Sequence, residues 1–273
     1  MQRYFDAIHT MDPDVLRGYL HPTATIKGVG PDGEMTSRNA ADFLDGIALG
    51  TPIGQPATPC IDPAVLELDR VLSLEQTSRT TILAKVQMAT PQGRDGKPAL
   101  FVDFLSLLRV GEEWHIVSKI FSTLPIDAPS GGYGYRRQGG CSDLAGVAGA
   151  VATEPWEVTA IASALQQYLD GCHCDVSALR TIFHPSAQLK GVNKEGELEV
   201  VSSEKFFERV EARRANMHAE DVGRPSELDK ILRIDRGGLR AAAATVQVAI
   251  SGGVDNDVLY TDHLSLLKLG GWG

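Results

Sequence analysis

Apolar residues recur with helical periodicity near the start of each half of this chain. In the second half they are spaced three or four positions apart, at Val158, Ile161, Leu165 and Leu169, which predicts a long helix that starts near Pro155. A second helix is predicted over 12–20 in one half and 175–183 in the other, each ending before a proline. A third is expected over 39–47 and 202–209, with N-caps at Asn39 and Ser202.

The rest of each half is rich in strand-forming residues. The runs that we predict as strands are 24–29, 65–75, 80–89, 100–110 and 114–121 in the first half and 228–236, 240–250 and 258–269 in the second. Helices that precede an antiparallel meander are typical of the α+β class. We therefore expect two curved, mainly antiparallel sheets, each with helices on one face.

The two halves are copies of each other. The stretch from His21 to Glu34 matches the stretch from His184 to Glu197 at eight of fourteen positions. Leu68-Asp69 recurs as Leu228-Asp229, and the Asp-x-Leu-Ser-Leu-Leu run at Asp103 recurs at Asp262. Matches that keep one order along the chain indicate a tandem duplication.

We expect domains at 1–123 and 155–273, joined by a Gly-rich flexible linker over 124–154. The first copy begins near the end of its first helix, and the second ends where the strand 114–121 should recur. Each copy is therefore expected to lack one piece, which suggests a fragment of a longer protein.

Composition narrows the range of functions. The net charge of −9 argues against a nucleic-acid partner, which would favour a basic surface. No apolar run approaches the roughly 18 residues of a membrane helix, so no membrane partner is expected. Four cysteines in 273 residues form no disulfide framework, which suits the cytoplasm.

Four motifs occur in a fixed order: Tyr-x-Asp, His-Pro-x-Ala-x-x-x-Gly-Val, Asp-x-Leu-Ser-Leu-Leu and Trp-x-Ile-Val-x-Lys. Together they resemble the putative lumazine-binding family of the nuclear-transport-factor-2-like (NTF2-like, SnoaL-like) superfamily. That resemblance implies two cone-shaped α+β rolls (a cystatin-like layout), each a bent sheet wrapped by about three helices around a pocket. Relatives on this fold include ketosteroid isomerase, polyketide cyclases and binding domains, so the fold alone does not fix a function.

Two residue types at matched positions are candidates for acid–base chemistry. His21 and His184 could titrate near neutral pH in a pocket, or could satisfy carbonyl groups at the end of the second helix. Asp103 and Asp262 stand in the most apolar strands, where an unpaired carboxylate is costly. They could act in the pocket, lie at a sheet edge or, for Asp103, pair with Lys119.

Aromatic and neighbouring residues complete the candidate pocket. Tyr4 and Tyr168 could point into the cavity from the first helix or pack with their hydroxyls at its rim. Trp114 and Trp272 are expected to pack at the start of the last strand. His263 follows Asp262, so alternation places these two side chains on opposite sheet faces.

No cofactor or metal is expected. Cys172, His173 and Cys174 carry metal-binding groups, but three adjacent residues cannot close a tetrahedral site, and the first copy has Ile8, His9 and Thr10 there. The chain has no dinucleotide fingerprint, phosphate loop or Gly-x-Ser-x-Gly elbow.

The sequence favours a small-molecule-binding or assembly module without catalysis, with an unknown ligand. The alternative is a cofactor-independent lyase, isomerase or cyclase that uses a pocket His/Asp pair on a small apolar substrate. Apolar residues of both parities in the strands, such as Leu105, Leu107 and Leu108, also predict self-association through sheet faces, as an intramolecular pseudo-dimer or a homodimer.

Overall fold

The computed structural model describes residues 1–10, 12–29, 34–50, 69–90, 99–125, 155–193, 195–215, 226–237, 240–251 and 257–269. The chain divides into two compact units, the first centred on 1–151 and the second on 152–235 and 243–266. Most of the expected linker, residues 126–154, lies outside the described residues, as does Trp272. Within the described part of the chain, no helix is long and apolar enough to cross a membrane.

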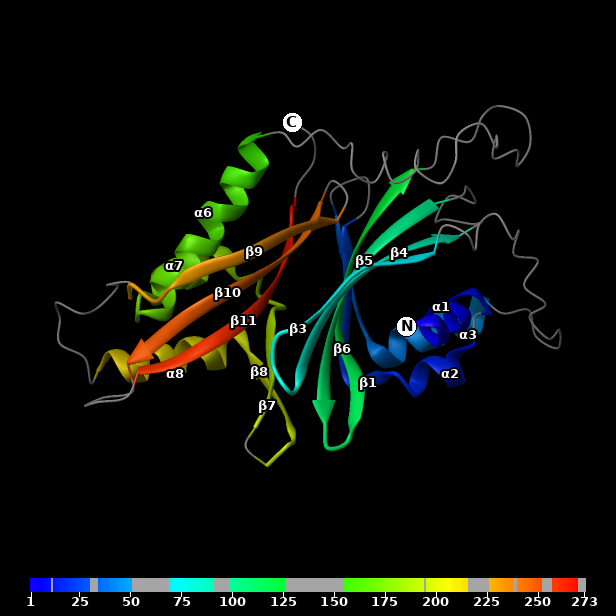
Figure 1. The fold of residues 1–273 in the computed structure, drawn as a ribbon, viewed down its shortest axis with the longest axis horizontal. Helices are drawn as coiled ribbons and strands as arrows, with labels where there is room; N and C mark the ends of the chain where they lie inside the picture. The colour runs from blue at the N-terminus through cyan, green and yellow to red at the C-terminus, as the bar shows by residue number, and fades with distance from the viewer. Residues whose placement is uncertain are drawn as a thin grey trace. The chain divides into compact units, whose positions relative to one another are not determined.

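The described residues of the first unit form three helices and one six-stranded sheet (Figure 1). The helices are α1 (Gln2–His9), α2 (Pro13–Arg17) and α3 (Ala40–Gly50). The strands are β1 (Leu20–Val29), β2 (Met35–Asn39), β3 (Arg70–Gln76), β4 (Thr81–Thr90), β5 (Ala99–Val110) and β6 (Glu113–Pro125). Their order is β2-β1-β6-β5-β4-β3, in which β1 and β6 are parallel and the other pairs antiparallel.

The described residues of the second unit repeat this series of elements as far as the counterpart of β5. Its helices are α6 (Pro155–Cys172), α7 (Val176–Ile182) and α8 (Ser203–Arg214). Strands β7 (Gln188–Val192) and β8 (Leu198–Ser202) form one small sheet, and β9 (Lys230–Gly237), β10 (Ala241–Ser251) and β11 (Asp257–Leu267) form another in the order β11-β10-β9. The α+β class and the tandem arrangement predicted from the pattern are confirmed.

Local signals set several element ends. The Asn39 side chain accepts the Asp42 N–H at 2.8 Å, and Ser202 Oγ accepts the Lys205 N–H at 3.2 Å, so both predicted N-caps are present. Several expected boundaries were wrong; helix α8, for example, runs to Arg214 rather than to residue 209. Helix α2 stops at Arg17 rather than residue 20, because Leu20 already pairs with Ile116 of β6. Strand β6 runs on to Pro125, into the expected linker, because its end pairs with the start of β5.

Each unit has its own apolar core between its helices and one face of its sheet. In the first unit α1, α2 and α3 contribute Phe5, Leu16 and Leu44, and the sheet contributes Val86 and Leu105. In the second unit the core is built in the same way, around Leu165, Leu179, Phe207, Val246 and Val248. These cores place the first helix of each unit directly over the sheet, and this position brings a helical tyrosine to a strand aspartate.

Candidate functional site

Tyr4, Asp103 and Lys119 form a buried polar cluster on the core face of the first unit. The Tyr4 hydroxyl donates to Asp103 Oδ2 at 3.0 Å, and Lys119 Nζ donates to the Tyr4 hydroxyl at 2.9 Å and to Asp103 Oδ2 at 2.5 Å. Asp103 pairs with Phe121 across β5 and β6, and Lys119 pairs with Leu105, so the two charged residues are diagonal neighbours on one face. Of the alternatives weighed for Asp103, the structure contains the pair with Lys119.

The cluster is almost fully withdrawn from water. Asp103 is 0% exposed and Lys119 6%. The ammonium lies 5.6 Å from the centroids of the Tyr4 and Phe121 rings and 5.9 Å from that of Phe43. Burial, followed by the charge of Asp103, raises the pKa of Tyr4 well above its ordinary value. Tyr4 therefore stays a neutral hydroxyl that can donate a hydrogen bond.

One atom of this cluster is unsatisfied. Asp103 Oδ1 is buried and has no hydrogen-bond partner among the described residues. A buried carboxylate oxygen without a donor costs free energy, so such an atom calls for an explanation. This unsatisfied atom and the partly exposed rings of Phe43 and Phe121, which lie near the Lys119 ammonium of the same cluster, mark the cluster as a candidate binding site.

The second unit has the same tyrosine and aspartate with different neighbours. The Tyr168 hydroxyl donates to Asp262 Oδ2 at 2.7 Å, and the Cys172 thiol lies beside it. Burial and then the charge of Asp262 raise the pKa of Cys172 to about 12, so this thiol is not a nucleophile near neutral pH. Burial also raises the pKa of Asp262, although the bond from Tyr168 acts in the opposite direction.

His21 and His184 hold equivalent local turns. Nδ1 of His21 lies 2.9 Å from Thr23 Oγ1 and accepts the Thr23 N–H at 3.2 Å; Nδ1 of His184 has the same distances to Ser186. The His21 ring contacts the His115 ring edge-on. His115 pairs with Leu108 of β5, and Leu108 is an odd number of residues from Asp103 on the same strand. Alternation therefore places His21 and Asp103 on opposite faces of the sheet. Their action as an acid–base pair stays a prediction.

The remaining expected pocket residues are dispersed. Trp114 is half-buried at the start of β6, where it pairs with Arg109. His263 Nδ1 lies 3.2 Å from Thr245 Oγ1, rather than at Asp262. The structure thus brings Tyr4 to Asp103 and Tyr168 to Asp262, and leaves the histidines elsewhere.

A second pair of matched contacts was not foreseen from the sequence. His9 Nε2 lies 2.5 Å from Asp69 Oδ2, and His173 Nε2 lies 2.6 Å from Asp229 Oδ2. The other oxygen of each aspartate accepts a strand N–H, from Ala89 and Ala249 respectively. Each pair therefore ties the end of a helix to the sheet. The available signal was the histidine kept in both copies, together with the repeated Leu-Asp.

The Cys172-His173-Cys174 run does not act as one ligand set. His173 is bound to Asp229, and Cys172 lies beside Tyr168. Within the described ranges, no group of three or more histidine, cysteine or acidic side chains is arranged to hold a metal ion.

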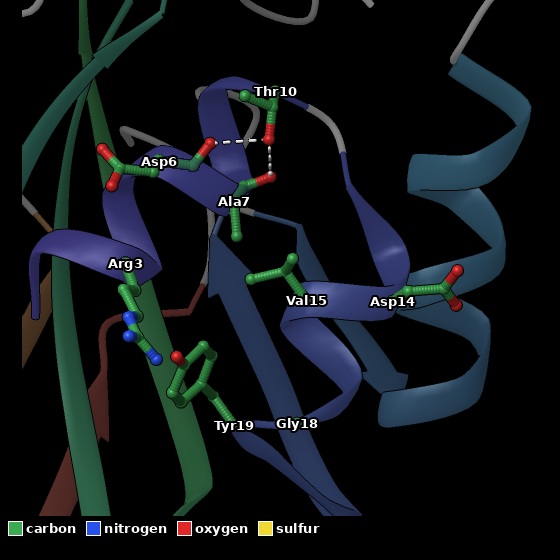
Figure 2. Close-up of a pocket in the computed structure, with 8 residues that line it drawn as sticks. All are labelled: Arg3, Asp6, Ala7, Thr10, Asp14, Val15, Gly18 and Tyr19. Carbon is green, nitrogen blue, oxygen red and sulfur yellow. Dashed lines mark hydrogen bonds between the residues drawn. The ribbon is translucent and has the colours of Figure 1, made fainter. Parts of the chain in front are cut away.

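A separate groove of about 560 Å³ lies between α1 and α2 of the first unit (Figure 2). Its lining residues are Arg3, Asp6, Ala7, Thr10, Asp14, Val15, Gly18 and Tyr19. None of the residues predicted as a site lines it, and its charged side chains lie at the surface. We therefore base the candidate site on the buried cluster.

One protein-family model matches the chain twice, once in each copy of the repeat. The family model described as "Putative lumazine-binding" matches residues 1–122 and again residues 156–272, which confirms the resemblance indicated by the motifs. A search of curated proteins finds no match.

Several solved structures similar to parts of the chain are described as NTF2-like proteins. An NTF2-like protein of unknown function from Shewanella baltica is 24% identical, over 46% of this chain and 88% of its own, with a TM-score of 0.35. One from Silicibacter pomeroyi is 18% identical, over 45% and 88%, with a TM-score of 0.34. A ketosteroid isomerase-like protein from Erwinia carotovora is 12% identical, over 46% and 91%, with a TM-score of 0.31.

Proposed function

Because the chain belongs to the putative lumazine-binding family, with two tandem copies of its domain, we propose that the first unit binds a small planar heteroaromatic molecule at Tyr4, Asp103 and Lys119. The observation that carries this proposal is the buried oxygen Asp103 Oδ1, which has no donor among the described residues. A ring N–H of a ligand would satisfy it.

The other groups of the cluster suit the same kind of ligand. An ammonium has three N–H donors, and the bonds to Tyr4 and Asp103 use two of those of Lys119, which leaves one for a ring carbonyl. Phe43 and Phe121 offer aromatic surfaces on which a flat ring can stack. Lumazine, a bicyclic ring with adjacent N–H and C=O groups, has this pattern of donors and acceptors.

The proposal is binding without catalysis. The carboxylate of Asp103 is already held by an ammonium and a hydroxyl, and the expected acid–base partner, His21, lies on the other face of the sheet. A poised general base needs a proton-accepting oxygen within reach of a substrate and a pKa near the working pH. The other proton carriers of the cluster, the Tyr4 hydroxyl and the Lys119 ammonium, are both bonded to Asp103 itself, so we propose that Asp103 Oδ1 accepts a hydrogen bond from the ligand without taking its proton.

The test is a fluorescence titration of lumazine with the full chain, with a steroid and riboflavin as comparison ligands. We expect saturable binding of lumazine that weakens at least tenfold in Asp103→Asn and in Phe43→Ala. The matched control is Asp45→Asn, an exposed carboxylate on the same helix as Phe43, which should bind as the parent does. Binding that is absent in the parent, or unchanged in folded Phe43→Ala, would contradict the proposal.

We also propose that the sheet faces mediate self-association. On β5 the residues of the core parity are Asp103, Leu105 and Leu107, and the opposite parity carries Val102, Phe104 and Leu108. A second apolar face suits contact with another sheet of the same kind, in the same chain or in a second copy. Small-angle scattering that fits two independent, freely tumbling lobes at high concentration would argue against this.

A further inference from the structure

Within the described ranges, β11 is an edge strand of the second unit. Among the described strands its only hydrogen-bonded neighbour is β10, and β7 pairs only with β8. In the first unit the equivalent strands, β5 and β1, both pair with β6, antiparallel to β5 and parallel to β1. The place that β6 takes in the first unit is thus held by no described strand in the second.

Residues of β11 and β7 are more exposed than their counterparts in β5 and β1, which β6 covers. Leu259 of β11 is 52% exposed, whereas its counterpart Leu100 is 4% exposed. On the core face, Asp262 and Leu264 are half-buried where Asp103 and Leu105 are fully buried. On the other side, Leu189 of β7 is half-buried where Ile26 is buried. An apolar strand edge of this kind is a template for another strand.

The buried aspartate of the first unit indicates one residue that a strand in the place of β6 would carry. In the first unit the ammonium of Lys119, which comes from β6, neutralises Asp103. In the second unit Asp262 has its bond from Tyr168 and no ion pair with any described residue. The first unit therefore supplies a template for a strand that would fit between β11 and β7: one with a lysine opposite Leu264, as Lys119 stands opposite Leu105.

We propose that the second unit binds an extended polypeptide strand by strand addition, antiparallel to β11 and parallel to β7. The strand presents apolar side chains to the core face and one inward lysine. Its ammonium donates to Asp262 and to the Tyr168 hydroxyl, as Lys119 does to Asp103 and Tyr4. Backbone hydrogen bonds give the strand its affinity, and the lysine fixes its register, because a shift by one residue would turn the lysine to the other face.

The experiment uses the full chain and a labelled peptide copied from residues 113–123, Glu-Trp-His-Ile-Val-Ser-Lys-Ile-Phe-Ser-Thr. Fluorescence anisotropy measures binding, and hydrogen exchange with mass spectrometry measures protection of residues 257–267 and 188–192. We expect saturable binding, protection of both segments, and at least tenfold weaker binding of a peptide with methionine in place of the lysine.

The matched chain variant is Asp262→Asn. It should still bind the peptide through the backbone, but should no longer distinguish lysine from methionine. Absence of protection at β11 and β7 would overturn the strand site. Equal binding of the two peptides to the parent chain would overturn the proposed lysine contact, whatever the affinity. Neither result depends on whether lumazine binds to the first unit.

Discussion

Replacing Asp103 by asparagine removes the charge that neutralises Lys119 and changes little else in shape. The ammonium of Lys119 is 6% exposed and lies 2.5 Å from Asp103 Oδ2, so the variant leaves it buried without a counter-charge. Removing one partner of a buried ion pair costs about 3–5 kcal/mol. Since a domain is typically stable by about 5–15 kcal/mol, the first unit should lose a large share of its stability.

The second unit provides the matched control at the equivalent position. Asp262 is half-buried and has no described ion-pair partner, and its asparagine variant keeps an oxygen that can accept the Tyr168 hydroxyl. We expect Asp262→Asn to change stability by no more than about 1 kcal/mol, the net value of an ordinary hydrogen bond. The two substitutions are chemically identical, so the difference between them reports the ion pair together with the deeper burial of Asp103.

The assay must distinguish the two units, because a single unfolding free energy is poorly defined for a chain of two units. Hydrogen exchange with mass spectrometry across a urea series follows peptides of β5 and β10 separately. The triple variant Asp103→Leu, Lys119→Met and Tyr4→Phe should recover most of the lost stability, since apolar replacement of a whole buried polar cluster is often neutral, whereas keeping the Tyr4 hydroxyl would leave it without its two partners. If Asp103→Asn costs less than about 1 kcal/mol, or no more than Asp262→Asn, the reasoning from buried charge is wrong.

Three further predictions concern packing, pH and capping. A Cβ on Gly28 would lie 2.3 Å from the Phe121 ring, so Gly28→Ala should destabilise the first unit by about 1–3 kcal/mol in urea unfolding, whereas Gly191→Ala, its counterpart with nothing within 4 Å, should not. Because burial raises the pKa of Asp262, the folded second unit holds this proton more tightly than the unfolded chain does. Its stability should therefore be highest below the ordinary carboxyl pKa and fall as pH rises through the raised pKa, and urea titrations of Asp262→Asn should lack that fall. Ser202→Ala should cost about 1 kcal/mol by removing the N-cap of α8, and an unchanged exchange rate in α8 would refute it.

The local part of the architecture could be predicted from the sequence. Helical and strand periodicities, the prolines after the second helix and the caps at Asn39 and Ser202 act over a few residues, so they can be read without knowing the fold. The repeat added a further constraint, because two copies of one domain must share a set of elements. The sequence missed the short strands β2 and β8, and it misplaced ends such as Arg17, where strand pairing with a distant segment decides the boundary.

The candidate site depended on tertiary structure in a different way. Recurrence in both copies singled out His21 and Asp103 equally, yet His21 bonds a residue two positions away, whereas Asp103 needs Tyr4 from α1 and Lys119 from β6. A residue that recurs in both copies can be required either for a local turn or for a tertiary site, and the sequence alone does not show which.

What the sequence determined by itself is therefore the helices, the longer strands, their tandem repetition and a set of candidate residues. Only the tertiary structure decided which of them meet. The contact between Asp103 and Lys119 requires the register of β5 against β6, and the contact between His9 and Asp69 requires a helix end to reach the start of β3. Contacts of this kind join residues that are far apart in the chain, and a shift of one residue in strand register would turn each strand side chain to the opposite face.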